Sequence, residues 1–194
     1  MINYPNGVKK NKKVQHPKTF DGNKNRGMVF EDKINTSNEI YRTKNVAIIY
    51  KKPTPIKVVK ITNTGLKQGK ITEAYYERPS TTDYNGIYRQ KYIDFEAKET
   101  LNKTSFPMHN IHAHQIEHLS RIKAMGGISF LIVSFRAFNE VYILDAGVVE
   151  KYNHTTRRSI PYEVIKKEGI LVPQGYVIRI DYLKAVDELY FKEK

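Results

Sequence analysis

A strand–helix–strand pattern over residues 92–135 constrains the fold of this chain more than any other feature of its sequence. Residues 92–98 alternate apolar and polar side chains, as a half-buried strand does, and residues 127–135 form a second strand that is almost wholly apolar. Apolar residues at helical spacing lie between them: Ile111, Ile116, Leu119, Ile122 and Met125. Gly126 and Gly127 predict the end of this helix, because glycine accepts left-handed backbone angles cheaply. A strand, a helix and a strand form a βαβ unit, so we predict an α/β fold with a mixed sheet and at least one parallel pair.

The rest of the chain adds strands and helices to this unit. Residues 62–70 are rich in Asn, Gly and Lys and lie between two strand-like runs, which predicts a long hairpin. The further predicted strands are 46–50, 56–61, 71–76 and 140–144, and the further predicted helices are 27–43, 161–168 and 182–189. We therefore expect a central mixed sheet flanked by helices.

Length and composition exclude several classes of protein. The 194 residues fit one domain, and the absence of Cys excludes a disulfide scaffold, a thiolate zinc site and a cysteine nucleophile. No apolar run approaches the ~18–20 residues that cross a bilayer. Residues 1–7 contain no apolar stretch of the kind found in secretory signals. We expect a soluble, cytoplasmic protein that does not act at a membrane.

The positive charge is concentrated in the first third of the chain. The net charge is +13, and residues 1–70 carry 16 Lys and Arg against 4 Asp and Glu, a net of +12. Residues 1–26 are basic and almost free of aliphatic side chains, so we predict a flexible arm there and a folded body over 27–194. Such asymmetry indicates a polyanionic partner, because basic side chains on phosphates release counterions. A solubilising basic tail is the alternative.

Carboxylates and an amine gather on one face of a predicted strand. In a strand over 92–98, Asp94, Glu96 and Lys98 share a face, because alternate side chains point the same way. Asp83 precedes this strand on a polar turn. Such a set suits a Mg²⁺ site at which a water attacks a phosphodiester and Lys98 stabilises the developing charge. The alternative is an ordinary exposed strand face with a Glu/Lys pair.

A histidine cluster offers a competing reading. His114, Glu117 and His118 fit the H-x-x-E-H pattern of a zinc peptidase family. No obvious third ligand accompanies them, and a peptidase does not explain the basic third of the chain. The alternative is a helix whose histidines are solvated or contact phosphate. The same helix, packed beside Glu96, would bring the Gln115 amide oxygen or a bridging water to the metal.

The sequence allows two roles for the carboxylate of Glu31. It stands near the start of the helix predicted over 27–43, where it would interact with the helix dipole. It would equally serve as an accessory acid if it faced the acidic site. The sequence favours neither.

Six segments of the chain match a known family: Ile2–Gly7, Asn25–Glu31, Lys51–Pro55, Pro79–Gly86, Tyr92–Thr100 and His114–His118. Together they resemble the RecU family, the Holliday junction resolvases of Gram-positive bacteria and their wall-less relatives. The resemblance runs from Met1 to about Phe191, and the block over 81–98 is highly specific. The fold family to which RecU belongs is named after a motif with a proline before its first aspartate. Here Thr82 precedes Asp83 instead, and RecU shares this substitution.

The resemblance implies a fold and an activity. The fold is restriction-endonuclease-like, of the PD-(D/E)xK type, with a protruding basic β-hairpin stalk over about 55–76 inside a nuclease domain of 27–194. The implied activity is paired, symmetric nicking of four-way DNA junctions by a homodimer in recombination and repair, with Mg²⁺, for which Mn²⁺ substitutes. A non-catalytic, architectural junction-binding protein is the alternative function.

Individual roles also follow from the resemblance. Asp83 and Glu96 match the metal carboxylates, Thr81 and Gln115 match positions that complete the metal site, and Lys98 matches the transition-state stabiliser. Arg26 matches an arginine that the family uses to modulate the recombinase RecA, and a branch-migration helicase is a further implied partner. The residues predicted to bind DNA are Arg26, Lys57, Lys60, Lys67 and Lys70.

Overall fold

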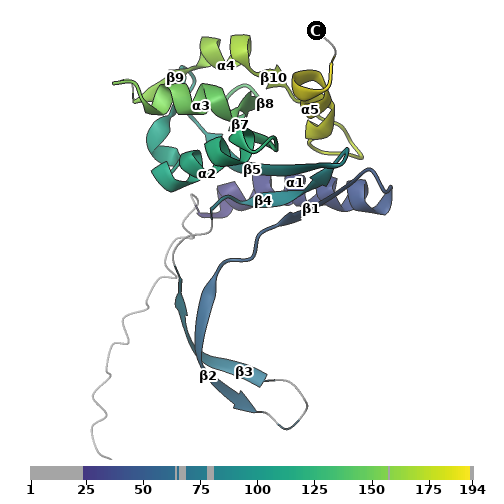
Figure 1. The fold of residues 1–194 in the computed structure, drawn as a ribbon, viewed down its shortest axis with the longest axis vertical. Coiled ribbons are helices and arrows are strands. Elements are labelled where there is room, and N and C mark those ends of the chain that lie inside the picture. The colour runs from purple at the N-terminus through teal and green to yellow at the C-terminus, as the bar shows by residue number, and fades with distance from the viewer. Residues whose placement is uncertain (1–23, 64, 66–68, 78–80, 157, 193–194) are drawn as a thin grey trace, which may run out of the picture.

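A six-stranded mixed sheet forms the centre of the molecule. The computed structural model describes residues 24–63, 65, 69–77, 81–156 and 158–192 (Figure 1). The strand order is β1-β4-β5-β7-β8-β10, in which β5 and β7 run parallel and every other pair is antiparallel. The strands are β1 (Ala47–Lys51), β4 (Tyr84–Tyr88), β5 (Lys91–Thr100), β7 (Ile128–Phe135), β8 (Glu140–Asp145) and β10 (Ile170–Leu171). The prediction of an α/β fold with a mixed sheet and a parallel pair is confirmed.

Helices cover both faces of this sheet. α1 (Lys24–Thr43) and α5 (Tyr182–Tyr190) pack on one face, and α2 (Ala113–Ala124), α3 (Ala146–Asn153) and α4 (Tyr162–Glu168) pack on the other. A small antiparallel pair, β6 (Ser105–Pro107) with β9 (Ser159–Pro161), and the 3-10 turn η1 (Met108–Asn110) complete the second layer. α2 is the helix that joins β5 to β7, and it stops as predicted, with Gly126 at a φ of 84°.

Stacked aromatic rings hold α5 and the central strands together. The Phe95 ring stacks on Tyr84 at a centroid distance of 4.8 Å and on Phe130 at 4.9 Å. Tyr182 of α5 closes over the Phe95 ring at 5.1 Å. All four side chains are fully buried. The odd-numbered face of β5 is therefore the apolar core face, as its alternation predicts.

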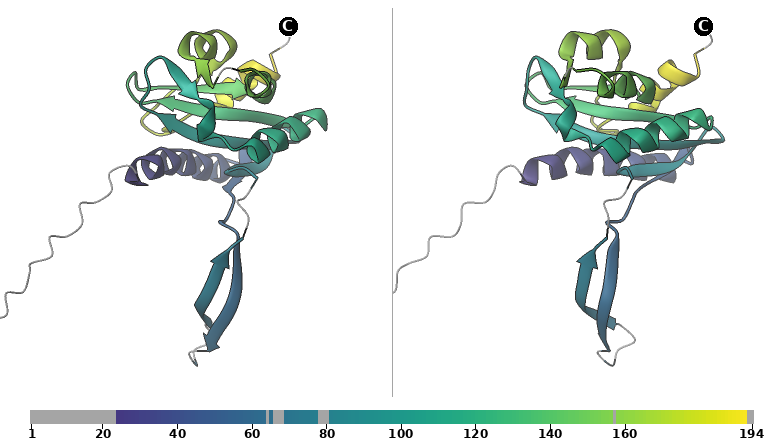
Figure 2. Two further views of the ribbon diagram at one scale, coloured as in Figure 1. Left: turned by 90° about the vertical axis from the view of Figure 1, so that its left-hand side faces the viewer. Right: turned by 60° about the vertical axis from the view of Figure 1, so that its left-hand side comes forward.

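A separate hairpin projects from this body. β2 (Ile56–Asn63) and β3 (Gly69–Tyr76) form a two-stranded antiparallel sheet of their own. All residues of β3 are exposed, and Figures 1 and 2 show the hairpin extending away from the helices and the central sheet in every view. The hairpin predicted from the sequence is thus present, with a register shift near Val59.

Some elements differ from the prediction. α1 begins at Lys24 rather than Gly27, and the basic arm predicted over 1–26 otherwise lies outside the described residues. The polar cluster before residue 87 contains a strand, β4, because Tyr84 is buried beside Phe95. Gly86 makes this possible, since a Cβ there would lie 2.0 Å from the Ile48 carbonyl oxygen of β1. α3 and β10 were not anticipated either; Asp145 caps α3 by accepting from the Gly147 amide at 2.8 Å.

Truncation of the stacked ring tests this core. We expect Phe95→Ala to lower the free energy of unfolding by about 3–5 kcal/mol, because it removes a buried aromatic side chain and leaves a cavity. Urea denaturation measures the change. Tyr176→Ala is the control, since that ring is 88% exposed and its loss is expected to cost less than about 0.5 kcal/mol. Equal losses for the two variants would contradict the assignment of Phe95 to the core.

Candidate functional site

Asp83 and Glu96 meet because β4 and β5 pair in antiparallel register. Tyr84 lies opposite Phe95 in this pair. Asp83, one residue ahead of β4, consequently lies beside Glu96 in the middle of β5. The Asp83 amide donates to Glu96 Oε2 at 3.0 Å, and the Ala97 amide donates to Asp83 Oδ2 at 3.2 Å. Two carboxylates predicted from the sequence therefore converge in the structure.

The polar face of β5 is buried rather than exposed. Asp94 and Glu96 both have 0% exposed side chains, because α2 crosses over this face on its way from β5 to β7. The Lys98 ammonium lies 2.5 Å from Glu96 Oε1, and the Gln115 amide nitrogen of α2 donates to the same oxygen at 2.7 Å. The alternative of an ordinary exposed strand face is therefore wrong.

Burial controls the protonation of the central carboxylate. Removal from water, and after it the negative charge of Asp83, raises the pKa of Glu96 to about 7, against the opposing effect of the Lys98 ammonium. A carboxylate whose charge is disfavoured in this way is stabilised by a cation placed beside it. The electrostatics of the pair therefore favour a bound positive ion.

A cavity of about 490 Å³ opens at these carboxylates. The body contributes Glu31, Lys51, Lys52, Thr82, Asp83, Glu96, Lys98, His112 and Gln115 to its wall. The root of the hairpin contributes Pro53, Thr54, Pro55, Tyr76 and Glu77. The carboxylate pair and the start of the projecting hairpin thus share one cavity.

Glu31 lies in the wall of this cavity. Because α1 begins at Lys24, Glu31 stands beyond the first turn of the helix, so the predicted dipole role at the helix start is wrong. Its carboxylate forms an ion pair with Lys51. The accessory-acid role of Glu31 remains a prediction, consistent with its place in the wall of the cavity that Asp83 and Glu96 also line.

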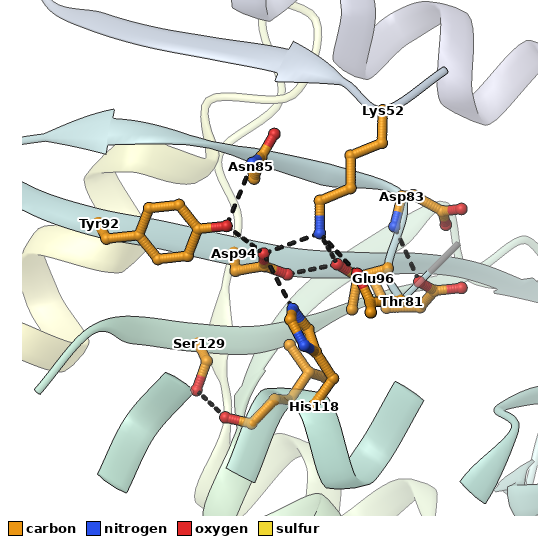
Figure 3. A network of polar contacts seen from close by, with 11 residues as sticks. Lys52, Thr81, Asp83, Asn85, Tyr92, Asp94, Glu96, His118 and Ser129 are labelled. Atoms are coloured by element: carbon orange, nitrogen blue, oxygen red, sulfur yellow. Dashed lines mark hydrogen bonds and ion pairs between the residues drawn. The ribbon is translucent and has the colours of Figure 1, made fainter. Parts of the chain in front are cut away.

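A second buried network surrounds Asp94, on the same face of β5 (Figure 3). The Lys52 ammonium lies 2.9 Å from Asp94 Oδ2, and the Tyr92 hydroxyl donates to the same oxygen at 2.8 Å. His118 Nε2 lies 3.3 Å from it. The Thr82 hydroxyl donates to the other carboxylate oxygen. Four polar groups thus surround one buried carboxylate.

The two neutral metal ligands implied by the resemblance are oriented differently from that expectation. Gln115 turns its amide nitrogen to Glu96, while its oxygen accepts from the His112 amide at 3.0 Å and caps α2. Thr81 is exposed, and its hydroxyl accepts from Lys52 at 3.1 Å. Metal ligation by Gln115 through oxygen requires its amide to rotate, and the ligand roles of Thr81 and Gln115 remain predictions.

The histidines of α2 are distributed over different surroundings. His118 contacts Asp94, whereas the His114 ring stacks on His112 at 5.5 Å. Among the residues that the structure describes, no three His, Asp or Glu side chains are grouped to hold a metal ion. The zinc peptidase reading therefore has no third ligand in the described part of the fold.

The residues predicted to bind DNA lie on the hairpin where they are described. Lys57, Lys60 and Lys70 are exposed, and Lys60 stands opposite Glu73 across the two strands. Lys67 and the Arg26 side chain lie outside the described residues. The hairpin therefore presents positive charge and also exposed apolar side chains, among them Ile61 and Tyr76.

The donor set at the cavity fits a hard divalent cation. Mg²⁺ binds oxygen, keeps several waters and commonly takes only one or two protein carboxylates, which Asp83 and Glu96 provide. The chain contains no cysteine, so the cavity offers carboxylate oxygens rather than the thiolates that are common at structural zinc sites.

Sequence reasoning missed two residues of the cavity wall, Lys52 and Glu77. The alternation of β5 places Asp94 on the polar face of that strand, but it does not predict the contact between Asp94 and Lys52. The local sequence does not show which of Lys51 and Lys52 turns inward. In the tertiary fold it is Lys52, with 14% of its side chain exposed, against 44% for Lys51.

The fold and the site together define a class of protein: an α/β protein in which a buried glutamate and a lysine on one strand, beside a parallel crossover, meet an aspartate from the preceding turn. Comparison with known proteins narrows this class. A model of the RecU family, described as Recombination protein U, matches residues 25–188. Proteins named "Holliday junction resolvase RecU" are similar along the chain: 46% identity to that of Bacillus cereus (strain G9842) and 47% to that of Bacillus thuringiensis (strain Al Hakam). Each alignment covers 98% of both chains.

This chain belongs to the RecU family. The family model covers most of the chain, and the identity to its relatives extends over nearly all of it, as the resemblance noted in the sequence predicted. Among the residues described, no helix is long and apolar enough to cross a membrane.

The raised pKa of Glu96 has a consequence for stability. In the unfolded chain Glu96 titrates near 4.5, and in the folded chain near 7, so between these values the folded protein binds the extra proton. The stability associated with this proton is lost as pH rises through about 7. With a chelator present, we expect the free energy of unfolding to fall from about pH 5 to about pH 8 by about 1–3 kcal/mol more in the wild type than in Glu96→Gln.

Urea denaturation at several pH values tests this difference. Glu188→Gln is the control, because Glu188 is an exposed glutamate of α5, and its curve is expected to run parallel to that of the wild type. A wild-type curve parallel to that of Glu96→Gln would mean that Glu96 does not carry the titration.

Proposed function

We propose that this protein is a metal-dependent endonuclease that resolves four-way DNA junctions. The observation that carries the proposal is the meeting of Asp83, Glu96 and Lys98 at a cavity whose other wall is the root of a basic hairpin. Membership of the RecU family, whose relatives are named Holliday junction resolvases, supports the same function. The site supplies the chemistry, and the hairpin supplies a surface for DNA.

Each group at the site has a distinct role in this proposal. Asp83 and Glu96 would hold the cation, which when bound would supply Lewis-acid stabilisation of the phosphate and a water nucleophile. Lys98 remains close to Glu96 and places an ammonium where negative charge develops on the phosphate. Mg²⁺ is the proposed cofactor, with Mn²⁺ as a substitute, because both favour oxygen ligands.

Symmetry completes the proposed mechanism. A homodimer with two-fold symmetry presents two equal sites, and a four-way junction offers two equivalent strands. One cut by each subunit gives symmetric nicks and hence resolution. We further propose a cytoplasmic location, with the recombinase RecA and a branch-migration helicase as partners.

The hairpin is proposed to select the junction. It stands apart from the body, all of β3 is exposed, and an isolated two-stranded sheet is only marginally stable in water. Exposed lysines beside exposed Tyr and Ile side chains suit contact with phosphates and bases. We therefore assign substrate choice to the hairpin and cleavage to the carboxylate site.

Substitution of the catalytic groups tests the proposed chemistry. We expect Glu96→Gln and Lys98→Ala each to reduce Mg²⁺-dependent nicking of a synthetic four-way junction by on the order of 10²–10³-fold, with junction binding retained. The rate is measured on labelled strands, beside a linear duplex and with or without a chelator, and binding by gel mobility shift.

Matched controls are available on α5. Glu188→Gln and Lys184→Ala alter exposed side chains and are expected to nick at the wild-type rate. Wild-type rates in Glu96→Gln and Lys98→Ala would contradict the catalytic assignment. Metal-independent binding by a wild-type protein that never nicks would favour the architectural alternative.

Salt dependence tests the assignment of the hairpin. Binding of the wild type to a junction is expected to weaken steeply as the salt concentration rises. The double variant Lys57→Ala/Lys70→Ala is expected to reduce the slope of log K against log salt by about 1–2, because each phosphate contact contributes about 0.9. Titrations at several salt concentrations give the slope. Lys151→Ala with Lys167→Ala, two exposed lysines of α3 and α4, is the control and is expected to leave the slope unchanged. A nearly flat wild-type response would count against a phosphate-binding surface.

A further inference from the structure

The Lys52 ammonium links three segments of the chain at the edge of the cavity. It donates to Thr81 Oγ1 at 3.1 Å, to Thr82 Oγ1 at 2.6 Å and to Asp94 Oδ2 at 2.9 Å (Figure 3). An ammonium has three N–H donors, so these contacts use all of them. Lys52 is thus satisfied by the protein itself and differs from a lysine held ready for a substrate phosphate.

Asp94 anchors this lysine to the rigid centre of the sheet. Its side chain is fully buried on β5, and the Tyr92 hydroxyl and His118 imidazole support the same oxygen that Lys52 contacts. A buried carboxylate surrounded by donors is held in one position, because every alternative leaves charge unsolvated. The ammonium is correspondingly fixed with respect to β5.

The backbone of Lys52 holds the same turn from another side. Its amide donates to the Asp83 carbonyl oxygen at 2.8 Å. Side chain and backbone together therefore restrain residues 81–83, the segment that carries the Asp83 carboxylate to Glu96. Residues 53–55 follow Lys52 directly and line the cavity. The Glu77 amide donates to the Pro55 carbonyl oxygen at 3.1 Å, so the root of the hairpin begins next to the contacts of Lys52.

We propose that Lys52, anchored by Asp94, is a positioning residue that sets Asp83 against Glu96 and fixes the hairpin root to the same point. The inference rests on the proposed nuclease function for its kinetic consequence, although the positioning itself is a property of the folded chain. It acts through Asp83 and contacts neither the phosphate nor the metal. An ordinary structural ion pair is the competing explanation.

The test uses a charge-balanced variant. Removing Lys52 alone leaves the Asp94 charge unpaired, which would both destabilise the fold and attract a cation. Lys52→Met combined with Asp94→Asn removes both charges and so leaves the net charge of the region unchanged. The matched control is Lys184→Met with Asp181→Asn, a second Lys–Asp pair with a contact of 2.8 Å, in which the buried Asp181 stands just before α5 and Lys184 lies on it.

Hydrogen exchange provides the readout that is independent of activity. In the metal-free protein, we expect the peptide covering residues 81–85 to exchange about tenfold faster in the Lys52/Asp94 variant, while β7 keeps its wild-type protection. The control variant is expected to leave residues 81–85 unchanged. Unchanged exchange at 81–85, or equal acceleration across β7, would overturn the positioning role.

Kinetics and metal binding supply the second readout. For junction nicking we expect kcat to fall about tenfold or more, with KM within about twofold of the wild type, because the hairpin lysines are intact. Calorimetric titration with Mn²⁺ in the absence of DNA is expected to give weaker binding, because the Asp83 and Glu96 carboxylates are less well aligned. A wild-type kcat and Mn²⁺ affinity in the variant would overturn the inference.

Failure of this inference is distinguishable from failure of the proposed function. A wild-type protein that does not nick junctions contradicts the function, whereas the exchange experiment still decides the positioning role. Should the double variant not fold, Thr82→Val provides a second test. It removes the hydroxyl that contacts both Lys52 and Asp94, at a nearly constant side-chain volume. It is expected to accelerate exchange at 81–85 as well, and wild-type protection there would overturn the proposal.

Discussion

Burial of two carboxylates on the central strand is the constraint on which the rest of this structure depends. Asp94 and Glu96 lie on the face of β5 that α2 covers, so both must be satisfied by the protein. Buried charges are tolerated only when donors or opposite charges surround them. Lys98 and Gln115 serve Glu96, while Lys52 and His118 serve Asp94. The polar layer between β5 and α2 therefore specifies how the helix, the strand and the turn before β4 fit together.

The two carboxylates differ in what surrounds them, and this difference separates their roles. Asp94 has four polar partners and is a closed structural centre. Glu96 lies against a second carboxylate, Asp83, at the wall of a cavity, and its pKa is raised accordingly. A like-charged neighbour is unfavourable without a cation. One strand thus carries a satisfied carboxylate and, two residues later, a carboxylate that a cation would stabilise.

The connection of the hairpin to the cavity gives the proposed substrate selection a physical route to the proposed site of cleavage. β1 ends at the cavity, the prolines after it lead into β2, and Tyr76 and Glu77, at and just beyond the end of β3, line the same cavity wall. Proline restricts the backbone, so the link at Pro53 and Pro55 is short and stiff. The hairpin is nonetheless exposed along its length and makes its own two-stranded sheet.

Sequence alone determined the α/β class, the parallel crossover, the hairpin and the sharing of one face by Asp94, Glu96 and Lys98, because these follow from local periodicity and glycine chemistry. It also indicated the family, which the comparisons support. Only the tertiary structure decided that this polar face is buried, that Lys52 rather than Lys51 turns inward, and that Gln115 presents nitrogen to Glu96. These outcomes depend on the packing of α2 over β5 and on hydrogen bonds between residues far apart in the chain, which no local pattern encodes.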